Sequence, residues 1–222
     1  MGIIATNVEK VLGEPPTRVL KNISVDIKDG EFIALTGRSG SGKSTLLYLL
    51  SSLDNPTEGK VEIDGADVTH MKKDDLYRFR NENMGFVFQF HYLISELTAL
   101  QNVLLPAKKY DLEHERIDHA KKLLVDFGLD GKFDRLPREL SGGEQQRVSI
   151  ARALVMEPKY IFADEPTGSL DTINGDLVMD IIKEVNQRLK TTVVMVTHDP
   201  DFAALAQRKI FLVDGQVVKE AT

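Results

Sequence analysis

The chain has 222 residues, 42% of them apolar and 28% charged, a composition typical of one compact α/β domain with or without an inserted subdomain. Acidic residues outnumber Lys plus Arg by 34 to 28, and the formal net charge of -6 disfavours nucleic acid as the main partner. The absence of cysteine excludes disulfides and thiolate metal sites, and no stretch of about 18 apolar residues is present to span a membrane.

The first third of the chain is predicted to be rich in strands. Residues 19–27 and 32–36 have strand-like patterns. Asp29-Gly30, Asp64-Gly65 and Asp214-Gly215 each separate two such runs, which predicts antiparallel hairpins at both ends of the chain.

A phosphate-binding loop is predicted at residues 37–45, GRSGSGKST, between an apolar strand and a helical run. The stretch matches G-x-x-x-x-G-K-[ST] in the strand–loop–helix context that this motif requires. We expect Lys43 to reach the β and γ phosphates of a nucleotide and the Ser44 hydroxyl to bind Mg²⁺. The predicted nucleotide-binding residues are Gly37, Arg38, Ser39, Gly40, Ser41, Gly42, Lys43, Ser44 and Thr45.

The middle of the chain, from about 89 to 154, is predicted to be mostly helical. Residues 113–128 have apolar side chains at helical spacing, with Gly128 placed to end the helix. After this region, two short apolar strands at 159–165 and 191–199 flank a helical run at 177–189. Strand, helix and strand in this order predict a parallel sheet.

Two adjacent carboxylates, Asp164 and Glu165, follow the first of these apolar strands. Ligands bind at the carboxyl ends of strands in open α/β sheets, so we expect Asp164 to hold Mg²⁺ and Glu165 to activate the attacking water. Gln89 and His198 also follow strand-like runs. Gln89 is a candidate contact for the metal or the water, and His198 for the γ-phosphate.

A second glycine-containing helix start lies in LSGGEQQRVSIARAL, residues 140–154. Ser141 and Glu144 have the spacing of a capping box, worth about 1 kcal/mol to the helix. Capping gives no reason for Gly142 and Gly143, whereas exposed backbone at a helix N-terminus suits an anion.

Taken in order, GRSGSGKS, Gln89, LSGGE, IFADE, SLD and His198 resemble the motif set of the ATP-binding cassette (ABC) ATPases. The resemblance implies that two cassettes meet head to tail, with each ATP between the P-loop of one and the signature of the other. It assigns nucleotide contacts to Ser141, Gly142, Gly143 and Glu144, catalytic roles to Glu165, His198 and Gln89, and Mg²⁺ contacts to Ser44, Gln89 and Asp164.

The stretches 86–107 and ADEPTGSLD resemble a group of cassettes for lipoprotein release, macrolide export and antimicrobial-peptide resistance. This implies a homodimer when ATP is bound, transmembrane permease partners, and a cytoplasmic location at the inner face of the cell membrane. The implied fold is a P-loop α/β domain with a mostly parallel sheet and an N-terminal antiparallel region. Residues 1–88 and 155–222 would form its core, and 89–154 an inserted helical subdomain.

The sequence departs from the family at one position, and it leaves several other functions open. Leu12 stands where the family usually has an aromatic residue that stacks on adenine, which implies either a lower nucleotide affinity or an apolar contact from Leu12 or Val19 in its place. Apolar residues at 90–100 exceed the needs of a polar lid and predict a docking surface for a membrane subunit. The alternatives are a cassette acting on nucleic acid or in translation, a small-molecule kinase, and a structural nucleotide-binding module.

Overall fold

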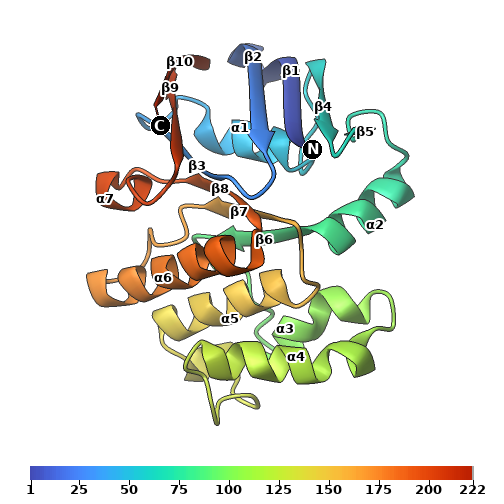
Figure 1. Ribbon diagram of the computed structural model, residues 1–222, viewed down its shortest axis with the longest axis vertical. Coiled ribbons are helices and arrows are strands. Elements are labelled where there is room, and N and C mark those ends of the chain that lie inside the picture. Colours follow the sequence, from blue (N-terminus) through green and yellow to red (C-terminus); the bar gives the residue numbers. More distant parts are fainter. Residues whose placement is uncertain (222) are drawn as a thin grey trace.

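Two β-sheets pack around α1 (Lys43–Leu50) in the upper and middle parts of the molecule (Figure 1). The computed structural model describes residues 1–221, with side chains for residues 1–218. The antiparallel sheet has the order β2-β1-β4-β5, from β1 (Gly2–Leu12), β2 (Thr17–Lys28), β4 (Glu58–Ile63) and β5 (Ala66–Asp67). The second sheet has the order β10-β9-β3-β8-β7-β6, from β3 (Phe32–Gly37), β6 (Met84–Phe88), β7 (Tyr160–Asp164), β8 (Thr192–Val196), β9 (Arg208–Val213) and β10 (Gln216–Ala221). Neighbouring strands of this sheet are parallel, except that β10 pairs antiparallel with β9.

Three of the helices form one group. A group at the lower end of Figure 1 comprises α3 (Ala99–Lys108), α4 (Glu113–Asp126) and α5 (Gly142–Leu154), which share a hydrophobic core. The remaining helical elements are α2 (Lys73–Asn83), a 3₁₀ turn (Pro137–Glu139), α6 (Thr172–Leu189) and α7 (Pro200–Ala203). The predicted α/β class, with a mostly parallel sheet, an antiparallel region and inserted helices, is confirmed.

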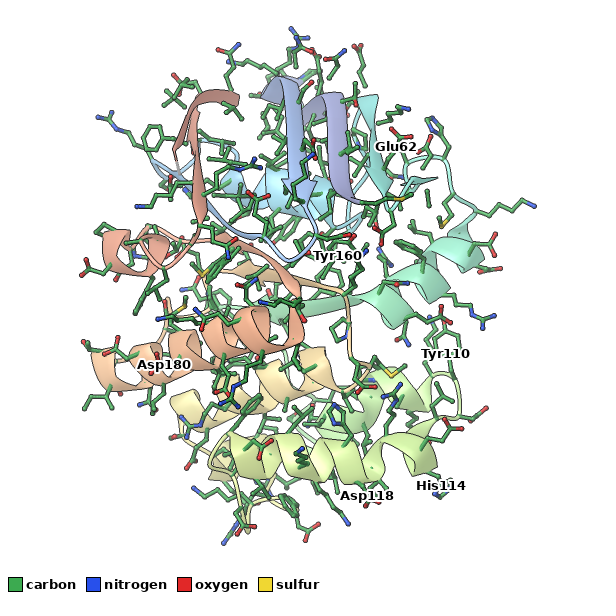
Figure 2. The ribbon with its side chains drawn as sticks, in the orientation of Figure 1. Glu62, Tyr110, His114, Asp118, Tyr160 and Asp180 are labelled. Carbon is green, nitrogen blue, oxygen red and sulfur yellow. The ribbon has the colours of Figure 1, made fainter. Side chains whose placement is uncertain are left out.

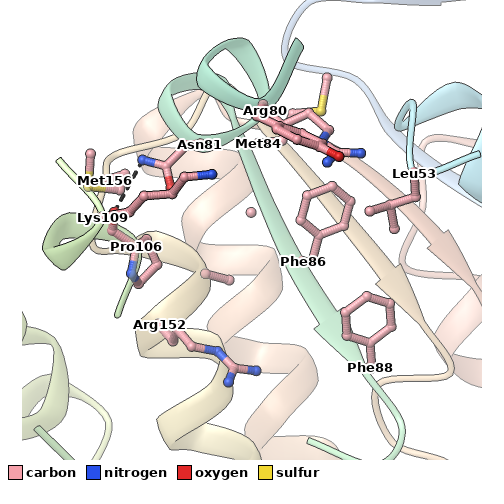
Figure 3. Close-up of a pocket in the computed structure, with 13 residues that line it drawn as sticks. Leu53, Arg80, Asn81, Met84, Phe86, Phe88, Pro106, Lys109, Arg152 and Met156 are labelled. Carbon is pink, nitrogen blue, oxygen red and sulfur yellow. Dashed lines mark hydrogen bonds between the residues drawn. The ribbon is translucent and has the colours of Figure 1, made fainter. Parts of the chain in front are cut away.

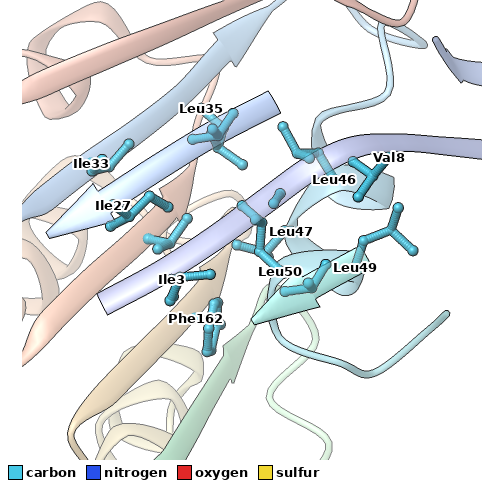
Figure 4. Close-up of a cluster of buried hydrophobic side chains, with 14 of the residues drawn as sticks. Ile3, Val8, Ile27, Ile33, Leu35, Leu46, Leu47, Leu49, Leu50 and Phe162 are labelled. Atoms are coloured by element: carbon cyan, nitrogen blue, oxygen red, sulfur yellow. The ribbon is translucent and has the colours of Figure 1, made fainter. Parts of the chain in front are cut away.

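The six-stranded sheet is covered on both faces. Successive strand residues point to opposite faces, so Ile33 and Leu35 join the core around α1 (Figure 4), whereas Phe32 faces the other way. The second face packs against α5 and α6 through Ile150 and Ile182. Burial on both faces explains why these strands read as continuous apolar runs.

The hairpin predictions are confirmed at two of three positions. Asp64-Gly65 joins β4 to β5, and Asp214-Gly215 joins β9 to β10, each as an antiparallel pair. The prediction at Asp29-Gly30 is wrong, because β2 belongs to the antiparallel sheet and β3 pairs in parallel with β8 and β9. Gly30 has a φ of 73° and its N–H donates to Thr192 Oγ1 at 2.9 Å. The turn therefore takes the chain from one sheet to the other. A Gly with positive φ suits such a connection as well as it suits a hairpin.

The predicted amphipathic helix is α4. Its inner side chains Ala120 and Leu124 are fully buried, and Gly128 follows it with a φ of 72°. Figure 2 shows His114 and Asp118 on its outer side, pointing away from the sheets. No helix within residues 1–221 has both the length and the apolar character needed to cross a membrane.

Candidate functional site

Parallel pairing aligns the predicted site residues along one sheet edge. In the β6–β7 pair Phe88 lies opposite Asp164, and in the β7–β8 pair Asp164 lies opposite Val196. Gln89, Glu165 and His198 therefore follow the carboxyl ends of three adjacent strands. The phosphate-binding loop leaves the end of β3, the next strand in the sheet. This edge is where open α/β sheets bind their ligands.

The loop between β3 and α1 is held tightly against the surrounding strands. Gly37 has a φ of 140° and Gly42 a φ of 99°. A Cβ at Gly37 would lie 2.3 Å from the Leu212 carbonyl oxygen, and one at Gly42 would lie 2.7 Å from Leu20 Cδ2. Both positions therefore require glycine.

Two polar side chains of this loop, Lys43 and Ser41, are held against the loop or buried. Lys43 Nζ donates to the carbonyl oxygens of Gly37 and Arg38 at 3.0 Å each. The Ser41 side chain is 4% exposed, and its hydroxyl has no hydrogen-bond partner among the described residues. The Ser41 hydroxyl without a partner and the Lys43 ammonium group bound to the loop's own carbonyl oxygens are both available to bind an anion.

Asp164 accepts hydrogen bonds from two side chains of α1. Ser44 Oγ donates to its Oδ1 at 2.9 Å, and the Tyr48 hydroxyl donates to its Oδ2 at 2.7 Å. Burial, followed by the contact with Asp164, raises the pKa of Tyr48 well above its ordinary value, so the phenol stays protonated. Sequence reasoning missed Tyr48, although it stands four residues after Ser44 and thus on the same helix face.

Glu165 and His198 form a pair at the surface of the edge. Glu165 Oε2 and His198 Nδ1 are 2.8 Å apart, and the two side chains are 20% and 72% exposed. Glu165 has a φ of 49°, and its backbone N–H donates to the Val196 carbonyl oxygen at 3.0 Å. The structure brings these two predicted residues together and leaves the pair open to a ligand.

Gln89 lies against the loop that follows Glu165. Its carbonyl oxygen accepts from Ser169 Oγ at 3.0 Å. A Cβ at Gly168 would lie 3.0 Å from Gln89 Nε2, so the amide side chain packs on this glycine. Gln89 is thus connected to the segment that contains Glu165 and the SLD stretch.

The predicted capping box at the start of α5 is present. Ser141 Oγ accepts from the Glu144 N–H at 3.3 Å, and a Glu144 carboxylate oxygen accepts from the Ser141 N–H at 2.8 Å. Glu144 also pairs with Lys132, whose hydrogen bond lowers the pKa of the Glu144 carboxyl.

The two glycines of this helix start differ in their surroundings. A Cβ at Gly143 would lie 2.2 Å from Asn174 Oδ1, so packing against α6 requires glycine there. This requirement was not evident from the sequence. Gly142 is exposed, and a Cβ there would meet only Leu170 Cδ2, at 4.0 Å. Gly142 is therefore the glycine that packing leaves unexplained.

The two glycine-containing helix starts lie on opposite sides of the six-stranded sheet. Helix α1 begins at Lys43, within the Gly37–Thr45 stretch, and packs in the core that contains Ile33 and Leu35. Helix α5 begins at Gly142 and packs in the core on the other face, with Ile161 and Ala163. Within one chain, the two helices therefore cover opposite faces of the sheet.

Comparison with known proteins identifies relatives that match nearly the whole chain. The ABC transporter family model matches residues 20–168. The chain is 52% identical over 217 residues to the lipoprotein-releasing system ATP-binding protein LolD of Leptospira interrogans, covering 98% of this chain and 91% of that one. The LolD of Aquifex aeolicus is 51% identical over 219 residues, with coverages of 98% and 96%. The macrolide export ATP-binding/permease protein MacB of Neisseria meningitidis is 49% identical, and the match covers 95% of this chain and 33% of that longer protein.

Solved structures agree with these matches. The dimeric structure of MJ0796, a bacterial ABC transporter cassette, superposes with a TM-score of 0.90 at 43% identity, covering 99% of this chain and 98% of that one. The post-hydrolysis dimer of the same ATP-binding cassette, bound to ADP and Pi, gives a TM-score of 0.88 at 41% identity, with the same coverages. These relatives favour the predicted transport function over a cassette that acts on nucleic acid. The chain belongs to the ABC transporter family, as an ATP-binding and ATP-hydrolysing cassette of the kind found in lipoprotein-release and macrolide-export proteins.

Proposed function

We propose that this chain hydrolyses ATP as one half of a head-to-tail pair and drives transmembrane subunits of a lipoprotein-release type of transporter. The observation that carries the proposal is the shared sheet edge, where the Gly37–Thr45 loop, Asp164 and the Glu165–His198 pair lie together. The names of the relatives support the lipoprotein class of cargo.

The nucleotide is proposed to lie on the Gly37–Thr45 loop. Lys43 would exchange its two carbonyl contacts for phosphate oxygens, and the unpaired Ser41 hydroxyl would donate to the same group. Ser44 and Asp164 supply oxygen donors of the type that Mg²⁺ prefers, with Gln89 as a further candidate. When bound there, Mg²⁺ would neutralise charge that develops on the phosphates.

Glu165 is proposed to accept the proton of the attacking water. Its side chain is partly exposed and hydrogen-bonded to His198, an arrangement that fixes the orientation of the carboxylate. His198 is the more exposed of the two and is proposed to contact the γ-phosphate as a donor. Gln89 is proposed to couple nucleotide binding at the site to movement of the loop that follows it.

The signature helix start is proposed to serve the ATP of the second cassette. Ser141, Gly142, Gly143 and Glu144 begin α5 on the face of the sheet opposite to α1, and Gly142 is exposed. The exposed backbone and the positive end of the helix dipole suit an incoming phosphate. The solved structures of the MJ0796 cassette are dimeric, which supports the pairing of two cassettes that this arrangement needs.

The docking surface for a membrane subunit is proposed to extend from a groove of about 340 Å³ to the segment after Gln89. Figure 3 shows Phe86 and Phe88 of β6 on one side of this groove. Phe88 contacts Tyr92 edge to face, with ring centroids 5.3 Å apart, and Phe90 is 69% exposed. Contact with membrane subunits would place the cassette at the cytoplasmic face of the membrane, and residues 89–154 are proposed to move as one subdomain.

Replacing Phe90 and Tyr92 by Asp tests this docking surface. The change should greatly reduce co-purification with membrane subunits, because two exposed apolar contacts become charged. Val125→Asp, at a 46% exposed position on α4, is the matched control. Leu93 is unsuitable for the test because it packs on the core of the helices. Undiminished assembly and transport in the double variant would exclude this surface.

The Glu165→Gln variant tests the proposed function. It should bind ATP, lose hydrolysis by about 100- to 10,000-fold because the base is removed, and accumulate as an ATP-dependent dimer in size-exclusion chromatography. Glu184→Gln is the control, since Glu184 pairs with Arg188 at an exposed position on α6. Hydrolysis at the wild-type rate in Glu165→Gln would refute the assignment of the base.

A further inference from the structure

A single buried amide on the signature helix connects three parts of the site. The Gln146 side chain on α5 is fully buried. Its Nε2 donates to the carbonyl oxygens of Pro166 at 2.6 Å and Phe88 at 3.3 Å. Its Oε1 accepts from Ser149 Oγ at 3.1 Å and lies 2.5 Å from His91 Nδ1. Both donor hydrogens of the amide are therefore in use, and its oxygen accepts from His91 and shares the Ser149 hydroxyl hydrogen with the Gln146 carbonyl oxygen, 3.0 Å from Ser149 Oγ.

These contacts involve the chain neighbours of Gln89 and Glu165, the residues proposed to act on ATP. Phe88 and His91 stand on either side of Gln89, and Pro166 immediately follows Glu165. Gln146 belongs to the helix that Ser141 begins. One rigid side chain thus joins the Gln89 segment, the Glu165 segment and the signature helix.

A second side chain of α5 fixes the same turn. Arg152 donates to the carbonyl oxygens of His91 and Tyr92 at 2.7 Å each. His91 and Tyr92 both have positive φ angles, of 58° and 46°. Burial lowers the pKa of His91, which keeps its ring neutral, with Nδ1 donating to Gln146. The turn after Gln89 is therefore tied to α5 from two sides.

We propose that Gln146 is a positioning residue for hydrolysis, setting Gln89 and Glu165 relative to the signature helix. This inference rests on the proposed function of the site. When α5 engages the ATP of a second cassette, a displacement of the helix passes through the Gln146 amide to both segments. Its hydrogen bonds are buried and fully made, so it transmits displacement rather than absorbing it.

The variant Gln146→Leu separates this role from a merely structural one. The side chain keeps a similar size but loses all four polar contacts, so kcat should fall about 100-fold, as expected when a catalytic group is misplaced by about 1 Å. The dissociation constant for ATP should stay unchanged, because the Gly37–Thr45 loop is untouched. In the Glu165→Gln background, ATP-dependent dimerisation should also persist. A purely structural role would instead weaken ATP binding and dimerisation together with kcat.

The neighbouring Gln145 provides a matched control. It is the same residue type on the same helix, but it is partly exposed, and among the described residues its side chain donates to the Leu140 carbonyl oxygen alone, at 3.1 Å. Gln145→Leu should keep the wild-type kcat. If Gln146→Leu does not give a folded cassette, His91→Leu tests the same connection at a half-buried loop position and should also lower kcat without changing ATP affinity.

The outcomes distinguish this inference from the function on which it rests. A wild-type chain that does not hydrolyse ATP would refute the proposed function. With wild-type hydrolysis intact, an unchanged kcat in a folded Gln146→Leu variant, or in His91→Leu where that variant replaces it, would overturn the positioning role. A parallel loss of ATP binding and kcat would overturn it as well.

Discussion

At the scale of single residues, Asp164 is the point where the phosphate-binding helix meets the carboxylate strand. Both of its oxygens accept hydrogen bonds from α1, one from Ser44 and one from Tyr48. Hydrogen bonds to a charged acceptor are about twice as strong as neutral ones. The carboxylate is therefore held in place before any nucleotide or cation arrives.

Leu12 stands where the resemblance to the family leads us to expect an aromatic residue that stacks on adenine. It is 45% exposed near the end of β1. Leu12→Tyr should lower the ATP dissociation constant by about 5- to 150-fold, since stacking on a base is worth roughly 1 to 3 kcal/mol. Isothermal titration calorimetry measures this change. Ile4→Tyr, on the same strand and also 45% exposed, is the control. Equal affinity in Leu12→Tyr and wild type would show that this position does not contact the base.

At the scale of secondary-structure elements, the signature helix α5 is joined to the start of α6. Asn174 donates to both carboxylate oxygens of Asp171, at 3.0 and 2.9 Å, and accepts from Arg147 at 3.2 Å. Asp171 is the N-cap of α6 and the last residue of the SLD stretch. The same Asn174 side chain fills the space beside Gly143. The signature and the SLD stretch therefore keep a fixed relation within one chain.

The two signature glycines should respond differently to alanine. Gly143→Ala places a methyl group against Asn174 and should destabilise the fold by about 1 to 3 kcal/mol, the usual cost of overpacking. Gly142→Ala has open space and should leave stability unchanged or slightly raised, while reducing ATP-dependent dimerisation because the methyl group covers exposed backbone. Thermal unfolding and size-exclusion chromatography measure the two effects. Equal stability of the two variants would contradict the packing argument.

Sequence patterns predicted the parts of the site that local motifs encode. The Gly37–Thr45 loop and the residues after β6, β7 and β8 could be located because a strand end and a polar residue are adjacent in the chain. Tyr48, Gln146 and Asn174 were missed, because their importance comes from partners distant in the sequence or on another element. Asp29-Gly30 misled for the same reason, since a turn signal does not specify which strand comes next in space.

At the scale of the whole molecule, helices α1 and α5, whose starts are the two proposed phosphate sites, lie on opposite faces of the six-stranded sheet. Each of these helices has glycine at or just before its first turn. Within one chain, the P-loop and the signature are not expected to bind the same ATP. In the proposed head-to-tail pair with twofold symmetry, each P-loop would meet the signature of the partner, so both sites would be completed at once.

Mixing two inactive variants tests this central claim most directly. Lys43→Ala disables the P-loop, and Ser141→Arg disables the signature. In an equal mixture about half of the dimers are mixed, and each has one intact composite site of two, so ATP hydrolysis should recover to about one quarter of the wild-type rate. Each variant alone should remain inactive. A mixture no more active than either variant alone would contradict the account, because sites built within one chain cannot complement each other.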